Sequence, residues 1–326
     1  MKMADLAMVK TAAENISGVL MEGQTIVLES TVPPGTSKNL VFPILRKNGV
    51  KSFYYAHCPE RAIPGKTLYE MVNNSRILGG LDEESVRKVK ELYASFVKGD
   101  IYVTDHKTAE FVKLMENTSR DISIALANEF SLMAEEMGIN VWEAIGLANK
   151  HPRVDILKPG PGVGGHCIAI DPLFLVEKSS KSRIVTLARE INDFMPVHVI
   201  HLTQEMLQGI KDPTITLLGL AYKANVDDTR ESPAFKIKRA AESEGIKVRI
   251  CDPLVKDYPG NASTIEDAVK DSDCIVLVTD HDVFKEIIPQ SLPVRSRNLI
   301  DTRNVLDHAL WRKAGYKVKV LGAGNL

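Results

Sequence analysis

A glycine-rich segment with a cysteine, PGPGVGGHCIAIDP (residues 159–172), carries the clearest chemistry in the sequence. Gly160, Gly162 and Gly165 have the G-x-G-x-x-G spacing of a dinucleotide fingerprint, which requires a buried strand before the glycines and a helix opening from them. The flanks do not fit, because the preceding NKHPRVDILKP contains two prolines and three basic residues and the following HCIAIDP stops at Asp-Pro. The segment instead predicts an anion-binding loop that presents Cys167 just ahead of a helix with Asp171 as its N-cap.

A second set of polar residues recurs along one long helical pattern. Lys113, Asn117, Asp121 and Asn128 are spaced by four, four and seven residues, so they share one face of a helix. Such a stripe is often only a solvated face. Asparagine is unfavourable in the middle of a helix, however, which favours a stripe that lines a buried polar site.

Three loops add further candidates. AHCPERAIPGK contains Glu60, ESTVPPGTS places Thr31 at the end of a strand, and GLAYKANVDDTRESPA carries Lys223 and Arg230 after a strand. The ends of strands are where α/β folds bind ligands, and the two cations could meet a nucleotide phosphate. The alternatives are a surface carboxylate in a turn for Glu60, a simple Thr-Pro turn for Thr31, and a solvated turn for the two basic residues.

Together these residues provide a thiol, an ammonium group, a carboxamide, carboxylates and a hydroxyl. That set suits oxidation of an aldehyde through a thiohemiacetal and a thioester, with Cys167 as nucleophile and its thiolate favoured by the helix N-terminus and by Lys113. A buried, inert cysteine is the alternative. A cysteine hydrolase would need a histidine partner, and His166 is disfavoured because neighbours in an extended loop point apart.

The elements that position these residues form an α/β pattern. Strands are predicted at 24–30, 51–57 and 101–104, with helices at 4–20, 36–47 and 82–98. A long helix is expected from Thr108 to Met137 and another over 185–208, followed by strands at 214–220, 247–252, 274–280, 298–301 and 316–321. We therefore expect two doubly wound Rossmann-like domains, 1–104 and 211–326, joined by a central helical segment, 105–210.

Composition limits the class of partner. The chain has 326 residues, a net charge of −1 and 44% hydrophobic residues, which suits a globular protein with small-molecule partners rather than nucleic acid or a membrane. The N-terminal pattern lacks the features of a signal peptide, so a cytoplasmic location is expected. The four cysteines show no C-x-x-C pair, which indicates neither a metal site nor a disulfide framework. Because the sequence starts in a helix, the first domain is expected to lack its first β-α-β unit with the glycine turn.

The motifs also resemble a known family. STVPPGT, CPER, AEFVKLMENTSRDISIALANE, GPGVGGHCIAIDP and GLAYKANVDDTRESPA, in this order, are similar to the UDP-glucose/GDP-mannose 6-dehydrogenases. Within that family, CPERAIPGK, HPRVDILKPGPGVGGHCIAIDP and LAREINDFMPVHVI look like the branch that acts on UDP-N-acetyl-D-mannosamine. The resemblance implies an NAD-dependent, four-electron oxidation of the sugar C6 alcohol to a carboxylate. UDP-glucose or UDP-N-acetylglucosamine as substrate, or a non-catalytic UDP-sugar-binding fragment, are the alternatives.

The resemblance also implies roles for individual catalytic residues. Cys167 forms the thioester, Lys113 stabilises the oxyanion, Asn117 and Asp171 hold the water that serves as base, and Glu60 takes part in thioester hydrolysis.

Binding roles follow from the same resemblance. It places Thr31 beside the nicotinamide and lets Arg230 reach toward NAD. Gly164 and Gly165 line the sugar site with backbone amides, and Lys223 contacts the UDP portion. Arg153 matches a position that reaches the substrate of a neighbouring subunit, so a homodimer or higher homo-oligomer is implied.

Overall fold

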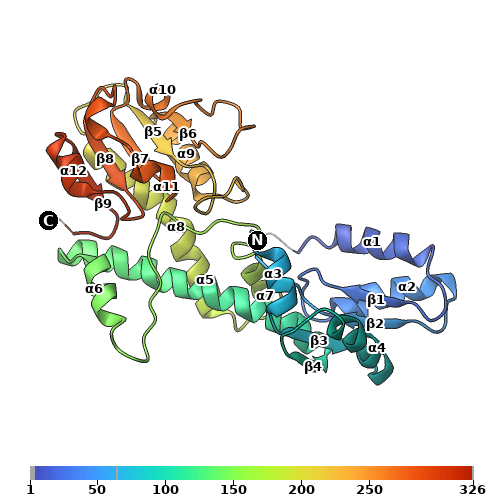
Figure 1. Cartoon of the computed structure of the whole chain (residues 1–326). Coiled ribbons are helices and arrows are strands. Elements are labelled where there is room, and N and C mark those ends of the chain that lie inside the picture. Colours follow the sequence, from blue (N-terminus) through green and yellow to red (C-terminus); the bar gives the residue numbers. More distant parts are fainter. Residues whose placement is uncertain (1–3, 64, 325–326) are drawn as a thin grey trace. The chain divides into compact units, whose positions relative to one another are not determined.

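The computed structural model describes residues 4–63 and 65–324. The chain divides into two compact units: unit 1 comprises Met1–Ser119 and Ile170–Arg183, and unit 2 comprises Arg120–Ala169 and Ile184–Leu326. Each unit contains one β-sheet with helices against it (Figure 1). The predicted α/β class, with two Rossmann-like sheets, is confirmed.

Unit 1 has a four-stranded sheet in the order β1 (Thr25–Leu28), β2 (Tyr54–His57), β3 (Arg76–Gly80) and β4 (Ile101–Asp105). β1 pairs with β2, and β3 with β4, in parallel, whereas β2 and β3 are antiparallel over a short register. β3 was not predicted. The sheet is therefore mixed rather than purely parallel.

The strands of unit 1 bury both faces. Side chains alternate between faces along a strand, so Ile26, Leu28 and Tyr55 pack in one apolar cluster with α1 (Ala7–Ser17) and α2 (Phe42–Leu45). Val27 and Ala56 belong to a second cluster with α4 (Glu83–Ala94). A π-helix, Ser37–Val41, precedes α2, and α3 (Thr67–Asn73) precedes β3. Helices on both faces match the layered architecture that the sequence predicts.

The long helix α5 (His106–Met137) starts directly after β4 and passes from unit 1 into unit 2. It begins two residues earlier than predicted because the side chain of Asp105 accepts hydrogen bonds from the N–H groups of Lys107 and Thr108. Two further helices of the central segment lie in unit 2, α6 (Val141–Ala148) and, apart from its first residue, α8 (Arg183–Met206). None of the helices in the described residues combines the length and apolar character that crossing a membrane requires.

Unit 2 has a five-stranded, all-parallel sheet in the order β6 (Lys247–Cys251), β5 (Thr214–Leu218), β7 (Cys274–Leu277), β8 (Asn298–Asp301) and β9 (Lys317–Val320). One apolar cluster joins it to α8 and α9 (Pro233–Ser243), and another to α10 (Ile265–Val269), α11 (Asp282–Lys285) and α12 (His308–Lys313). This is a doubly wound sheet. Its strand order reverses at β5, so ligands are expected outside the carboxyl ends of β5 and β7.

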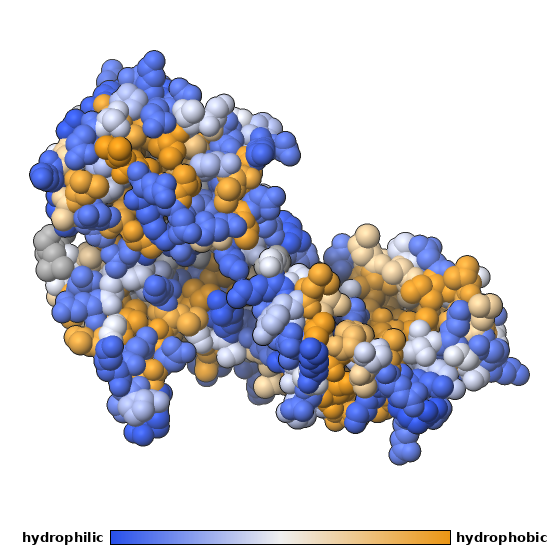
Figure 2. Space-filling model, in the orientation of Figure 1, coloured by the Kyte–Doolittle hydropathy of each residue, from blue (hydrophilic) through white to orange (hydrophobic). Residues whose placement is uncertain are grey.

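Both units still expose apolar side chains, as Figure 2 shows in orange on the visible face. In unit 1, Met8, Val19 and Leu68 are among the most exposed apolar residues. Scattered exposed apolar side chains are normal in folded proteins and need no special function.

Candidate active site

Asn117 and Asp171 are in direct contact in unit 1. The Asn117 amide Nδ2 on α5 donates to Oδ2 of Asp171 at 2.5 Å. Asp171 is buried and is the first residue of α7 (Asp171–Lys178), whose N-cap is Ile170. The prediction that Asp171 is the N-cap is therefore wrong, since its carboxylate bonds a side chain of another helix. Lys113 is half-buried and lies one helical turn before Asn117 on the same face of α5.

Glu60 is held by three hydrogen bonds in the loop after β2. Its Oε1 accepts from the N–H groups of Arg61 (2.6 Å) and Ala62 (2.7 Å), and its Oε2 accepts from Nη1 of Arg76 (2.9 Å). Burial works against the charged form, but the bonds from Ala62, Arg76 and Arg61 outweigh it and lower the pKa of Glu60. Glu60 is therefore an ionised carboxylate fixed in one orientation.

Arg76 is a residue that the sequence analysis missed. Its guanidinium is almost fully buried, donates to the carbonyl of Met71 at 3.2 Å and lies over the ring of Tyr93 at 5.3 Å. It belongs to β3, the strand that was not predicted, within NNSRILGG. Nothing in that short segment indicates that its one charged residue faces inward.

The loop with Thr31 is anchored by a buried carboxylate. Glu110, on the first turns of α5, accepts hydrogen bonds from the N–H groups of Gly35 (2.5 Å) and Ser37 (2.7 Å). Glu110 is fully buried, and Thr31 is half-buried. The backbone after β1 is thus held rigidly by α5. The sequence analysis did not identify Glu110, because a single glutamate among apolar helix residues usually indicates an exposed face.

The glycine loop is an irregular segment in unit 2. The structure describes every residue from 151 to 170 and assigns no strand among them, so the segment is not a dinucleotide fingerprint. Gly164 packs against the neighbouring loop, since an added Cβ would lie 2.6 Å from Cβ of Tyr222. Gly165 has a φ of +88° and donates its N–H to the carbonyl of Arg230 at 2.9 Å. Cys167 is exposed, so the alternative of a buried, inert cysteine does not apply.

The other half of the polar stripe stabilises unit 2. Asp121 on α5 accepts from Nη1 of Arg189 (2.6 Å) and from Nδ2 of Asn192 (2.8 Å), both on α8. Asn128 donates to Asn192 (2.9 Å) and accepts from the N–H of Gly160 (2.9 Å). Asp121 and Asn128 are fully buried. Burial raises the pKa of Asp121 despite Arg189. This network joins α5, α8 and the base of the glycine loop.

Basic residues surround the loops of unit 2. Lys223 and Arg230 are exposed in the segment between β5 and α9, and Arg230 pairs with Asp228 at 2.7 Å, which raises the pKa of Arg230. Arg303, which the sequence analysis missed, donates to the carbonyl of Val278 at 2.9 Å. Its guanidinium lies beside Gly160, where an added Cβ would be 2.7 Å from Nη1. Burial lowers the pKa of Arg303.

Arg153 lies in the exposed segment after α6. Its N–H donates to Nδ1 of His151 at 3.3 Å, a contact within the segment itself. Arg153 is thus available at the surface of unit 2.

The candidate residues are therefore divided between the two units. Unit 1 contains Thr31, Glu60, Lys113, Asn117 and Asp171, and unit 2 contains Arg153, Gly164, Gly165, Cys167, Lys223 and Arg230. Unit 1 supplies carboxylate, ammonium and amide groups suited to moving protons, and unit 2 supplies a thiol and cations suited to binding an anionic ligand. The N–H of Gly165 already donates to the carbonyl of Arg230, so it is not a free donor for a ligand.

Three family profiles match the chain in succession. Residues 1–97 match the NAD binding domain of the UDP-glucose/GDP-mannose dehydrogenase family, residues 107–194 its central domain, and residues 216–308 its UDP binding domain. A protein of Methanococcus maripaludis named UDP-N-acetyl-D-mannosamine dehydrogenase is 49% identical, over 99% of this chain and 76% of that protein. A Ralstonia solanacearum protein named NDP-N-acetyl-D-galactosaminuronic acid dehydrogenase is 41% identical, over 93% of this chain and 75% of that protein.

A solved structure supports the same relationship. The UDP-D-ManNAc dehydrogenase of Pyrococcus horikoshii superposes with a TM-score of 0.93 at 41% identity, covering 99% of this chain and 78% of that one. The similarity between the two structures covers the residues of both units.

Proposed function

Since the chain belongs to the UDP-glucose/GDP-mannose dehydrogenase family, we propose that it oxidises the C6 alcohol of UDP-N-acetyl-D-mannosamine to a carboxylate, with two NAD reduced per sugar. The family makes the chain an NAD-dependent UDP-sugar dehydrogenase in which residues 1–97 represent the NAD-binding domain. The choice of the mannosamine substrate depends on one observation, the 49% identity with the dehydrogenase of that name along 99% of the chain.

The residues present in unit 1 fit a cofactor at the carboxyl ends of β1 and β2. The two strands are parallel, and the N–H of Cys58 donates to the carbonyl of Leu28. The N–H of Glu60 donates to the carbonyl of Glu29, so the loops with Thr31 and Glu60 start side by side. Ligands of α/β sheets bind outside this edge. NAD bound there would supply the hydride acceptor for both oxidations at C6.

The chemistry assigned to the chain's own residues starts with proton removal. The hydrogen-bonded pair Asn117 and Asp171 holds a water that takes the proton of the C6 hydroxyl, and the ammonium group of Lys113 stabilises negative charge on the sugar oxygen. The Cys167 thiolate then adds to the aldehyde carbon to form a thiohemiacetal, whose second oxidation gives a thioester. Water attacks the thioester, releases the carboxylate and restores the thiol. The lowered pKa of Glu60 supports its part in that hydrolysis as a carboxylate.

Counting NADH per sugar tests this function. The chain is mixed with NAD and UDP-N-acetyl-D-mannosamine, with UDP-glucose, UDP-N-acetylglucosamine and UDP-N-acetylgalactosamine in parallel samples. Two NADH per UDP-N-acetyl-D-mannosamine, at the highest kcat/KM of the four, is the expected result. A higher kcat/KM for another UDP-sugar would identify that sugar as the substrate instead. UDP binding without NADH formation would favour the alternative of a non-catalytic binding fragment.

We also propose a homodimer. Phe111, Met115, Leu126 and Met133 leave apolar side chains exposed along α5, which a second copy could cover. Arg153 would then reach the substrate of the partner copy, as the resemblance implies. Sedimentation equilibrium at micromolar concentration tests the dimer, and a single species of 36 kDa would contradict it. The three-domain division and the cytoplasmic location stay predictions.

A further inference from the structure

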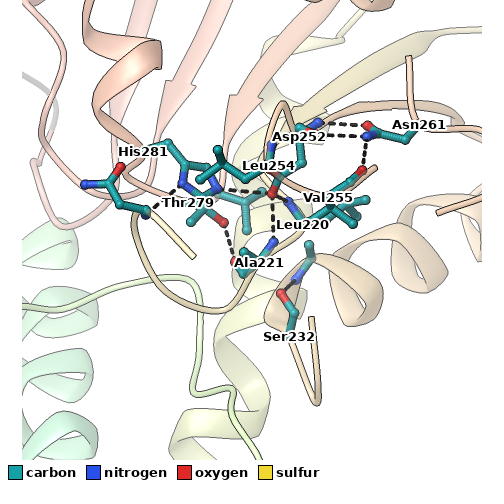
Figure 3. Close-up of polar contacts among 12 residues, drawn as sticks. Leu220, Ala221, Ser232, Asp252, Leu254, Val255, Asn261, Thr279 and His281 are labelled. Carbon is teal, nitrogen blue, oxygen red and sulfur yellow. Dashed lines mark hydrogen bonds and ion pairs between the residues drawn. The ribbon is translucent and has the colours of Figure 1, made fainter. Parts of the chain in front are cut away.

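The loop after β5 is held at several points by side chains from neighbouring loops (Figure 3). We define the β5 loop as Gly219–Asn225, which includes Lys223. The carboxylate Oδ2 of Asp252 accepts from the N–H groups of Leu220 (2.6 Å) and Ala221 (2.9 Å), and Oγ1 of Thr279 donates to the carbonyl of Ala221 (2.6 Å). The start of the β5 loop is therefore fixed before Lys223.

His281 fixes the other end of the β5 loop. The N–H of Asn225 donates to Nδ1 of His281 at 2.9 Å, and Nε2 of the same ring lies 3.1 Å from Oδ2 of Asp252. Because a backbone N–H can only donate, Nδ1 is the acceptor and Nε2 carries the proton that is donated to Asp252. The imidazole is fully buried and packs edge to face on Phe284, with the two ring centroids 5.5 Å apart. One neutral ring thus connects both ends of the loop.

The backbone of Asn225 is left-handed. Its φ is +58°, a conformation that asparagine adopts more readily than most residues other than glycine. The Asn225 side chain exchanges two hydrogen bonds with Asp282, at 2.7 and 3.1 Å. Consecutive residues, His281 and Asp282, therefore hold the backbone and the side chain of Asn225 respectively.

The placement of the β5 loop gives these contacts a function. It leaves the carboxyl end of β5, and His281 follows the end of β7, which are the two strands at the reversal of the sheet where ligands bind. Lys223 is exposed, while Asp252, Thr279 and His281 are buried. The loop thus combines an exposed lysine with buried contacts that support its backbone.

We propose that His281 is a positioning residue, which keeps the β5 loop in the conformation in which Lys223 binds the diphosphate of a nucleotide sugar. The inference rests on the proposed function, because that function assigns Lys223 to the UDP portion. His281 is not proposed to contact the ligand itself. It acts through the N–H of Asn225 and the carboxylate of Asp252.

Calorimetric titration of the full chain with UDP tests the inference directly. His281→Leu removes both hydrogen bonds of the ring and is expected to weaken UDP binding about tenfold, because the loop can then leave the conformation that binds UDP. His281→Asn keeps an acceptor near the place of Nδ1 and should restore most of the affinity. In steady-state assays, His281→Leu should raise KM for the UDP-sugar while KM for NAD and kcat stay close to wild type.

A double-mutant cycle with Lys223→Ala shows whether the effect passes through Lys223. The double variant His281→Leu/Lys223→Ala should bind UDP more tightly than the product of the two single effects predicts, because the second change removes a contact that the first has already weakened. Simple multiplication of the two effects would overturn the inference. As a matched control, His198→Leu removes an imidazole of the same unit whose Nε2 lies 2.8 Å from Oε2 of Glu135. This variant should keep its UDP affinity within twofold of wild type.

The outcomes separate this inference from the proposed function. Unchanged UDP affinity in folded His281→Leu overturns the role of His281 alone, whereas a wild-type chain that binds no UDP overturns the proposed function as well. If His281→Leu does not fold, His281→Gln and His281→Asn decide. Gln keeps a donor toward Asp252 but loses the acceptor for Asn225, so it should bind UDP more weakly than Asn, and equal affinity in both would contradict the inference.

Discussion

Gly164 lies against the β5 loop with no space for a larger side chain. An added Cβ would lie 2.6 Å from Cβ of Tyr222, 2.9 Å from Cδ of Pro233 and 3.0 Å from the carbonyl oxygen of Glu231. Carbon atoms in contact are normally about 3.5 to 4.0 Å apart, so Gly164→Ala requires a displacement of about 1 Å between the two loops. Two of the three atoms are held by backbone or by a proline ring, which leaves little freedom to adjust.

This displacement should reduce catalysis more than stability. A misplacement of about 1 Å at a reacting group can lower the rate about 100-fold, and overpacking of this kind costs about 1 to 3 kcal/mol of folding free energy. We therefore expect kcat/KM of Gly164→Ala for the UDP-sugar to fall about 100-fold, with the protein still folded.

Gly146 provides the matched control for the same chemical change. It lies in α6 of the same unit, and an added Cβ there would meet nothing within 4 Å. Gly146→Ala should leave kcat/KM unchanged and raise the free energy of unfolding by about 1 kcal/mol, because alanine favours the helix. NADH formation and urea denaturation measure both quantities. A folded Gly164→Ala with kcat/KM within twofold of wild type would refute the packing argument.

Three further variants test the assigned chemistry. Cys167→Ser should abolish uronate formation and leave UDP-sugar binding nearly intact; uronate at the wild-type rate would remove Cys167 from the mechanism. Lys113→Ala should lower kcat much more than it raises KM, and equal losses would mean that Lys113 mainly binds substrate. Because folding lowers the pKa of Glu60, this residue stabilises the fold above the pKa of an unfolded glutamate, and the contribution disappears as the pH falls through the lowered value. Arg76→Met should therefore lower the free energy of unfolding by about 2 kcal/mol at pH 7 and by less at pH 3, as measured by urea denaturation. An equal loss at both pH values would argue against the stabilising ion pair between Arg76 and Glu60.

The helices and strands with long, regular patterns could be predicted from the sequence. α5 was expected from Thr108 to Met137 because nothing interrupts its period, and the strands of unit 2 were expected because each is a short apolar run between turn residues. β3 could not be recognised, since RILGG is short and ends in two glycines. The first sheet is mixed for a reason that no local pattern contains, namely the pairing of β2 with β3.

The sequence identified several residues of the candidate site but not the residues with which they form hydrogen bonds. The sequence indicates that Asn117 and Asp171 are important, but only the structure shows their hydrogen bond and the resulting error in the assignment of Asp171 as an N-cap. Glu110 and Arg76 were missed because burial of a charged side chain depends on partners far away in the sequence. The same limit applies to Asp121, for which a solvated face and a buried network produce the same helical spacing.

Asp252 occupies a position that has a different role here than in dinucleotide-binding domains of the same fold. It follows β6, the second strand of the doubly wound sheet along the chain, where a dinucleotide-binding domain has an acidic residue for the adenosine ribose. Here Oδ2 accepts from Leu220, Ala221 and His281, and Oδ1 accepts from the N–H of Leu254 at 3.0 Å.

Three of these bonds fall on Oδ2, which is therefore fully used, and one falls on Oδ1, which keeps about one acceptor position. Burial opposes the charge of Asp252, but the bonds from His281, Ala221 and Leu220 lower its pKa to about 2, so the acceptors stay in place at neutral pH. The Asp252 side chain is almost fully buried, so it does not face ribose hydroxyls and stabilises the β5 loop instead. This agrees with the match of residues 216–308 to a UDP binding domain, and it explains why the acidic residue at the end of β6 does not make unit 2 a second site for NAD.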